Sequence, residues 1–185
     1  MPLTKENHQT LLQIAKQSIQ HGLNSNGPIP ITLDNYASEL QELTATFVTL
    51  EINSNLRGCI GTLLAFRPLV EDVAYNAYAA AFSDPRFPPL GSNEVAELAI
   101  HISLLSEPEL MTFNSEEDLI QQLRPHIDGL ILTDGSHKGT FLPSVWESLS
   151  QPTEFLQNLK QKAGLPVNYW SKKLTVERYT TEYIS

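Results

Sequence analysis

The sequence predicts an α+β fold with a largely antiparallel sheet and packed helices. Helical segments alternate with short runs rich in β-branched residues, and some runs are joined by turns too short for a parallel crossover. A length of 185 residues with 41% hydrophobic residues suits a single domain with a sizeable buried core. No repeat, low-complexity tract or linker interrupts the chain. We therefore expect one domain over residues 4–184.

The first predicted element is an amphipathic helix. Apolar residues recur at helical spacing over residues 11–23. Thr4 is suited to its N-cap and Gly22 to the position just after its end. The turn-forming residues 24–30 predict a loop, and residues 34–43 favour a short helix.

A hairpin follows. Residues 44–53 are rich in β-branched and aromatic side chains and predict a strand. A turn at residues 54–55 leads to a second strand over residues 59–65, which must return antiparallel because the turn is so short. Cys59 is therefore expected near the start of a strand, beside a turn, where solvent reaches it.

The next helix is predicted from Pro68 to Phe82. Proline suits a first helical turn, and the acidic pair Glu71 and Asp72 suits the positive end of the helix dipole. Residues 83–90 contain three prolines and cannot be helical, so they predict a stiff loop.

The second half of the chain predicts further elements of both kinds. Ser115 is expected to cap a short helix that ends at Pro125. The other expected elements are a strand at 99–105, a strand at 130–132, a turn at 134–135, a flexible loop at 136–139, helices at 143–149 and 153–163, and a terminal strand at 172–183.

Composition and charge exclude several classes of protein. Twelve basic and 21 acidic residues give a net charge of −9, which repels duplex nucleic acid. No apolar stretch is long enough to span a bilayer, so we expect no membrane partner. A single cysteine allows no internal disulfide, and the chain opens without a basic, apolar leader. We therefore expect a cytoplasmic protein.

The segment Leu56–Gly61 carries the densest set of chemical options. It holds Cys59, the only cysteine, between Gly58 and Gly61, with Arg57 two positions earlier. Arginine stabilises a nearby thiolate, and glycine lets backbone N–H groups approach a ligand. One interpretation is a thiolate nucleophile beside an oxyanion- or phosphate-binding backbone. The other is a small buried hydrophobe, because free cysteines are among the most buried residue types.

A thiol nucleophile needs a base, and the sequence alone does not select one. The histidines are His8, His21, His101, His126 and His137. The first two are expected on the surface of a helix, and His101 inside a strand as a satisfied core residue. His137, in the glycine-flanked loop, is the best candidate for the base.

The neighbouring charges also have two interpretations. Arg57 binds a ligand carboxylate or phosphate, or it pairs with Asp84 and pins the proline-rich loop to the sheet. The ion pair is slightly favoured. Asp84 and Arg86 shape the rim of a pocket, or Asp84 caps a turn while Arg86 holds carbonyl groups.

Metal and nucleotide cofactors find no support, so we expect none. Zinc sites need close Cys or His pairs, and calcium loops need alternating carboxylates. The nearest approach is His126 with Asp128. The glycines fit neither a Walker A motif nor a dinucleotide fingerprint.

Several motifs in order carry a resemblance to a known family. Residues 56–63, Leu-Arg-Gly-Cys-Ile-Gly-Thr-Leu, resemble the signature of the AMMECR domain family, also called AmmeMemoRadiSam system protein A. Supporting blocks in the expected order cover nearly the whole chain: 47–50, 80–82 with 84–87, 102–106, 128–130, 140–143 with 145–146, 155–156, and 162–165 with Trp170.

The resemblance implies a compact α+β unit of two unequal subdomains. It also implies a pathway shared with a Memo-type protein and a radical-SAM protein, because the family's genes often accompany theirs. The sequence has no CxxxCxxC cluster, so this chain is not the iron–sulfur member of that trio.

Two functional hypotheses follow. The favoured one is an accessory or binding protein that holds a small anionic ligand or a partner protein at Leu56–Gly61. The alternative is a thiol-dependent transferase or hydrolase with Cys59 as the catalytic nucleophile. The predicted binding residues are Arg57, Gly58, Gly61, Asp84, Arg86 and His137.

Overall fold

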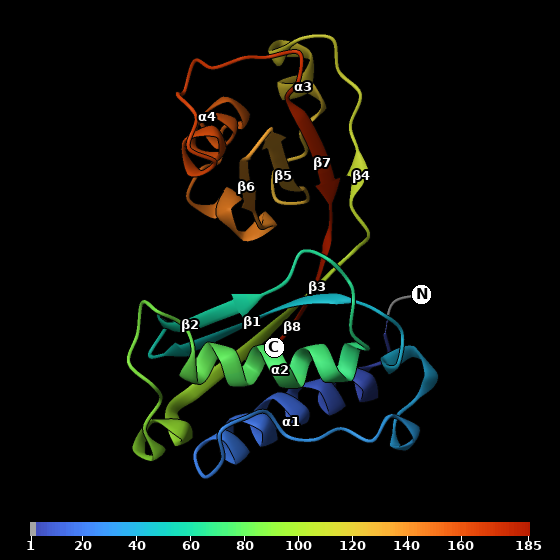
Figure 1. Cartoon of the computed structure of the whole chain (residues 1–185), viewed down its shortest axis with the longest axis vertical. Coiled ribbons are helices and arrows are strands. Elements are labelled where there is room, and N and C mark those ends of the chain that lie inside the picture. The colour runs from blue at the N-terminus through green and yellow to red at the C-terminus, as the bar shows by residue number, and fades with distance from the viewer. Residues whose placement is uncertain (1–2) are drawn as a thin grey trace. The chain divides into compact units, whose positions relative to one another are not determined.

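The computed structural model describes residues 3–185 and confirms the α+β class (Figure 1). The chain forms two compact units of unequal size. The first comprises residues up to Leu105 together with Glu182–Ser185, and the second comprises Ser106–Thr181. Each unit has its own four-stranded sheet, where the sequence predicted one. Between residues 3 and 185 no helix has the length and apolar character needed to cross a membrane.

The first unit consists of a sheet with two helices packed on one face (Figure 1). Its strands lie in the order β2-β1-β3-β8, so β2 and β8 are the edges. The elements are α1 (Lys5–Gly22), β1 (Ala45–Ile52), β2 (Asn55–Gly61), α2 (Leu69–Phe82), β3 (Leu98–Leu105) and β8 (Thr181–Ile184).

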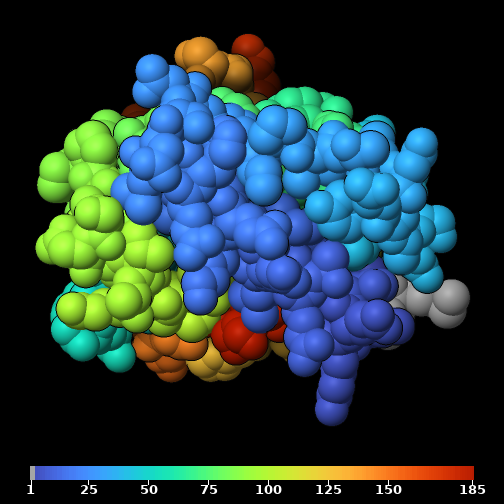
Figure 2. Space-filling model, turned by 90° about the horizontal axis from the view of Figure 1, so that it is seen from below, coloured from blue at the N-terminus to red at the C-terminus, as the bar shows by residue number. Residues whose placement is uncertain are grey.

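Strand alternation decides which face the helices cover. Val48 and Leu50 on β1 and Ile102 on β3 are completely buried in one core with the apolar residues of α1 and α2. The odd-numbered residues of β1 and β3 therefore point to the opposite face, which we call the far face. Figure 2 shows α1 and the segment that follows it forming the outer surface of the helical layer.

The N-terminal helix begins as predicted but ends differently. Thr4 is its N-cap, and its hydroxyl accepts a hydrogen bond from the Asn7 amide at 3.2 Å. Gly22 is the last helical residue and does not follow the helix. A Cβ there would lie 2.4 Å from the Phe82 ring, so glycine is needed for the close packing of α1 on α2.

The hairpin turn lies one residue earlier than predicted. Asn53 and Ser54 both have positive φ, at 50° and 63°, as a two-residue hairpin turn requires. The second strand therefore starts at Asn55, four residues before the predicted start, and pairs antiparallel with β1. The expectation that Cys59 lies near a strand start is wrong, because it is the fifth residue of β2.

Short 3-10 helices replace or supplement the predictions elsewhere in this unit. The predicted helix at 34–43 is instead two short turns, η1 (Leu33–Asn35) and η2 (Ser38–Leu40). The sequence did not predict η3 (Ser92–Glu97), whereas the loop at 83–90 lacks regular structure, as expected.

The second unit has strands in the order β4-β7-β5-β6. Ser115 caps its first helix, as predicted, by accepting from the Asp118 amide. Its elements are β4 (Glu109–Leu110), α3 (Glu116–Gln122), β5 (Gly129–Asp134), β6 (His137–Phe141), η4 (Pro143–Glu147), α4 (Pro152–Lys162) and β7 (Thr175–Tyr179).

Two predictions for the second half are wrong. Residues 136–139 are not a flexible loop, because β6 begins at His137 directly after a turn in which Gly135 has a φ of 60°. The predicted terminal strand at 172–183 is two strands, β7 and β8, which belong to different sheets. Alternation along one run cannot reveal that a chain leaves one sheet and joins another.

Candidate functional site

Cys59 lies on the edge strand β2 and faces Thr49 on β1, which in turn faces His101 on β3. Directly opposed residues point to the same face of a sheet, so these three side chains form a row on the far face. The Cys59 Sγ lies 3.3 Å from the Thr49 Oγ1, and the cysteine is half-buried. The row results from the register of two strand pairs.

The loop after α2 covers the edge of the sheet at Cys59. Asp84, which is only 4% exposed, accepts a hydrogen bond from the Cys59 amide at 2.9 Å. The Arg86 Nη2 lies 3.4 Å from the Cys59 carbonyl oxygen. These side chains thus occupy the place that a further strand would take on an edge. The Cys59 amide is consequently not free to bind an anion.

Asp84 and Arg86 form a two-pronged ion pair. The Arg86 Nε lies 3.0 Å from the Asp84 Oδ1, and its Nη2 lies 2.7 Å from the Oδ2. The Arg86 guanidinium, helped by the amides of Cys59 and Arg86, holds the pKa of Asp84 well below its ordinary value despite burial. The hydrogen bonds to Asp84 in turn raise the pKa of Arg86.

Arg57 does not pair with Asp84, so the favoured prediction for it is wrong. It forms a fork with Glu94 of η3, with Nε–Oε1 and Nη2–Oε2 distances of 2.7 and 3.1 Å. This hydrogen bonding raises the pKa of Arg57 and lowers that of Glu94. Glu94 also accepts from the Gly91 amide at 2.8 Å. The Arg57 Nη1 is buried and has no hydrogen-bond partner among the described residues.

Phe87 brings the two arginines together. The guanidinium carbon of Arg57 lies 5.9 Å from the centre of the Phe87 ring, and that of Arg86 lies 5.5 Å from it. Each arginine has its own carboxylate, in Glu94 and Asp84, so the four charges balance. The cluster of Arg57, Asp84, Arg86, Phe87 and Glu94 is therefore ordered but close to neutral.

The two glycines of the motif are explained by packing. A Cβ on Gly58 would lie 2.1 Å from the carbonyl oxygen of Ala80, because α2 rests directly on β2. A Cβ on Gly61 would lie 2.2 Å from the ring of Phe47. Both positions need glycine for close approach, whatever else the motif binds.

The predicted base, His137, lies in the second unit at the start of β6, where its Nδ1 lies 3.1 Å from the Ala163 carbonyl oxygen. The histidine that shares the far face with Cys59 is His101. Its Nε2 lies 3.4 Å from a Glu51 carboxylate oxygen, while its buried Nδ1 has no partner in the described chain. The alternation of Ile100 and Ile102 around it was the sequence signal that it faces away from the core.

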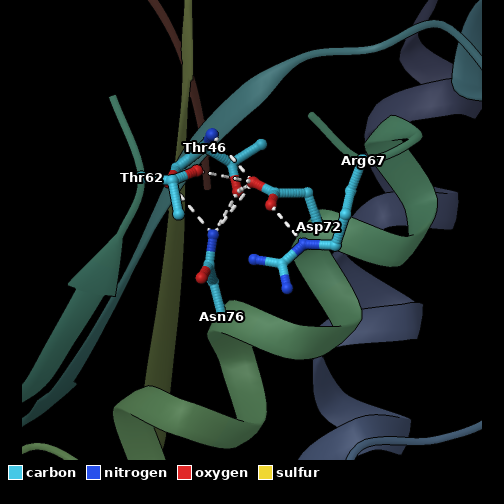
Figure 3. A network of polar contacts seen from close by, with 5 residues as sticks. All are labelled: Thr46, Thr62, Arg67, Asp72 and Asn76. Atoms are coloured by element: carbon cyan, nitrogen blue, oxygen red, sulfur yellow. Dashed lines mark hydrogen bonds and ion pairs between the residues drawn. The ribbon is translucent and has the colours of Figure 1, made fainter. Parts of the chain in front are cut away.

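The sequence also did not predict a buried network of hydrogen bonds at the start of α2 (Figure 3). Asp72 is 1% exposed, and its Oδ2 accepts from the Thr46 amide at 3.0 Å, the Thr46 hydroxyl at 2.7 Å and the Asn76 amide group at 2.9 Å. Its Oδ1 accepts from the Arg67 Nε at 3.0 Å. The network ties β1, the β2–α2 connection and α2 together, whereas the sequence suggested only a favourable charge at a helix end.

Metal ligation has no support among the residues described. Between residues 3 and 185, no three His, Cys, Asp or Glu side chains are placed to hold a metal ion together. The chemistry available near Cys59 is therefore that of a thiol, a hydroxyl, two arginines and a histidine–glutamate pair.

Comparison with known proteins identifies the family. The AMMECR1 family model matches residues 12–184. The chain belongs to the AMMECR1 family. It is 33% identical over 187 residues to a protein of Methanothermobacter thermautotrophicus, covering 98% of this chain and 95% of that one. A Thermotoga maritima protein is 38% identical over 138 residues, covering 74% of each chain.

A solved structure of the same fold is also similar. The crystal structure of an uncharacterized protein from Pyrococcus horikoshii matches with a TM-score of 0.89 and 33% identity. The match covers 98% of this chain and 92% of the other. The AMMECR1 family resemblance expected from the sequence is therefore confirmed.

Proposed function

We propose that this AMMECR1-family chain is an accessory protein that binds a partner protein at the Leu56–Gly61 motif. The proposal rests on the contacts at Cys59 in the edge strand β2: Asp84 accepts a hydrogen bond from its amide, and Arg86 lies against its carbonyl oxygen. Groups held in place before binding lose little conformational entropy on association. Arg86 remains 54% exposed and thus available to a partner.

A partner protein fits this surface better than a free small anion does. Arg57 and Arg86 are each neutralised by a carboxylate, so an isolated anion gains little attraction from them. A protein can in addition contact the exposed guanidinium, the half-buried thiol and Phe87. The family resemblance points to a Memo-type protein and a radical-SAM protein as the partners.

Purified partners from the same cell provide the test. Wild-type chain is titrated calorimetrically with each of the two proteins, and we expect binding to at least one. Arg86→Lys keeps the charge but loses the fork, and it should weaken binding about tenfold, as removal of an arginine hot spot does. No binding in any combination, including a mixture of all three proteins, would count against the proposal.

Arg124→Lys is the matched control. Arg124 also forms an ion pair through Nε and Nη2 with a buried aspartate, Asp128, in the second unit, where both nitrogens contact the same oxygen, Oδ1, and its side chain is 48% exposed. Both variants lose a two-nitrogen contact to a buried aspartate, so a difference in binding reports on the Cys59 surface. Equal losses for both would show that the Arg86 effect comes from general destabilisation.

A second candidate function is supported by the row on the far face. Cys59, Thr49 and His101 lie in register, and a Glu51 carboxylate oxygen lies 3.4 Å from the His101 Nε2, on the side where an orienting carboxylate would act. The cysteine and histidine are two strands, and so roughly 10 Å, apart, too far for direct proton transfer. An enzyme would therefore need the substrate to span the row.

Alkylation of the single thiol tests this alternative. A nucleophilic Cys59 should react with iodoacetamide at pH 7 faster than free cysteine does. A thiol that reacts more slowly than free cysteine would eliminate the enzymatic function.

A further inference from the structure

The first unit carries a second surface with the features of a protein-docking site, beside the start of α2. Large apolar side chains are exposed in the connection that leads into α2 and on its first turns: Leu64 by 68%, Phe66 by 58% and Tyr75 by 44%. Leu43, exposed by 60%, belongs to the same surface because it pairs with Pro68. Clustered exposed apolar groups of this size mark binding sites more often than single ones do. We call this region the Arg67 surface.

Arg67 holds the two rings in place. Its guanidinium carbon lies 4.4 Å from the centre of the Phe66 ring and 3.9 Å from that of Tyr75. Its Nε is bound to the buried Asp72, which Thr46 and Asn76 fix in turn (Figure 3). The aromatic groups are thus supported by a buried network, which reduces the entropy that a partner must remove on binding.

A small pocket adjoins the stack. Its volume is about 220 Å³, and its walls are Pro28, Ile29, Ile31, Arg67, Glu71, Ala74 and Tyr75. Pockets for small molecules usually measure roughly 300–1,000 Å³, so this one is small for a cofactor. It suits one large apolar side chain, as anchor residues of protein partners require.

Acidic residues lie at the Arg67 surface beside its arginine. Glu71 lines the pocket, and Glu42 lies next to α2, where its carbonyl oxygen accepts from the Leu69 amide at 2.9 Å. Neither glutamate is ion-paired within the described chain, and Asp72 balances the charge of Arg67. The net charge of the whole chain, −9, has the same sign. A basic partner is therefore attracted and an acidic one repelled.

We propose that the Arg67 surface binds a basic protein segment that inserts one large apolar side chain into the pocket. Arginine or lysine residues on either side of that anchor would meet Glu42 and Glu71. A second copy of this chain is a poor occupant, because a two-fold interface would set the acidic rims against each other. A small anion gains little from an arginine already neutralised.

Designed peptides test the proposal. The probe is a labelled nonapeptide with a central Phe, two Lys on each side and a Gly/Ser background, and its comparators carry Ser for Phe or Glu for Lys. We expect the Phe–Lys peptide to bind at least about tenfold more tightly than either comparator. In NMR titrations this peptide should shift the signals of Ile31, Phe66 and Tyr75 of the protein.

Variants of the intact chain locate the site. Leu64→Ser and Phe66→Ser should each weaken the Phe–Lys peptide about fivefold to tenfold, since both side chains are exposed contacts. Leu110→Ser is the matched control, because Leu110 is equally exposed, at 69%, but lies in the second unit. Glu71→Lys should shift the preference towards the Glu-flanked peptide.

Several results would overturn the proposal. Equal affinity for Lys- and Glu-flanked peptides would show that charge does not select the partner. NMR shifts confined to other residues would show that the peptide binds elsewhere. Concentration-dependent dimerisation that Phe66→Ser abolishes would make a second copy the occupant. Binding to phosphatidylserine–phosphatidylcholine vesicles that Phe66→Ser abolishes would make it a lipid surface.

Discussion

At the scale of the residue, the signature owes much of its composition to close packing. Gly58 lies against the backbone of α2, and Gly61 lies under the ring of Phe47. Cys59 is fixed through its backbone by Asp84 and Arg86 and contacts Thr49. Gly58 and Gly61 leave no room for a side chain, with or without a ligand, whereas the contacts of Asp84 and Arg86 at Cys59 involve only its backbone.

Gly58→Ala tests this explanation. The added methyl would meet the Ala80 carbonyl, so α2 must move away from β2, and we expect a loss of about 1–3 kcal/mol in the free energy of unfolding. The control is Gly27→Ala, where a Cβ meets nothing within 4 Å. Urea denaturation of both variants gives the comparison, and equal stabilities would show that the sheet tolerates a side chain at Gly58.

At the scale of the element, the sequence predicted helices and strands well where one periodicity governs a segment. The bounds of α1, α2, β1 and β3 were close to those observed, because each buries a regular apolar face. The sequence was a poorer guide to which polar side chains pair with one another. Nothing local indicated that Arg57 pairs with Glu94, 37 residues away, or that Asp72 is buried against β1. Strand register and loop path decide such pairs.

The loop that carries Asp84 gives a pH-dependent prediction. The pKa of Asp84 is lowered on folding, so its ionised form stabilises the folded chain above the unfolded value of about 3.9. That stabilisation is lost as the pH falls below 4 towards the folded pKa. Asp84→Asn should therefore be less stable than wild type at pH 7, and the difference should shrink below pH 4.

Hydrogen exchange measures the effect of the same variant at a single amide. The Cys59 amide, which donates to Asp84, should exchange faster in Asp84→Asn at pH 7. A stability difference that stays constant from pH 7 to pH 3 would contradict the assignment to this carboxylate.

At the scale of the whole molecule, each unit has its own apolar core. The second core surrounds Trp146, whose ring stacks on Phe155 at 3.8 Å and whose Nε1 donates to the Asp128 carbonyl. The first unit is completed by β8, which follows the second unit in sequence. The second unit is thus continuous in the chain, and the first is not.

A fragment of residues 106–180 should therefore fold alone. It contains all four strands of its sheet and the complete second core. Dispersed NMR signals and cooperative thermal unfolding would be the expected result. A fragment without either would show that the second core depends on the remainder of the chain.

A partner protein bound at the β2 edge, where Asp84 and Arg86 hold Cys59, would be detected by hydrogen–deuterium exchange of the full chain, measured with and without the Memo-type or radical-SAM protein that binds it. We expect this binding to give new protection at residues 57–61 and 84–87. Protection elsewhere, with these two segments unchanged in a saturated complex, would contradict it; protection confined to residues 64–75 would instead place that partner on the Arg67 surface.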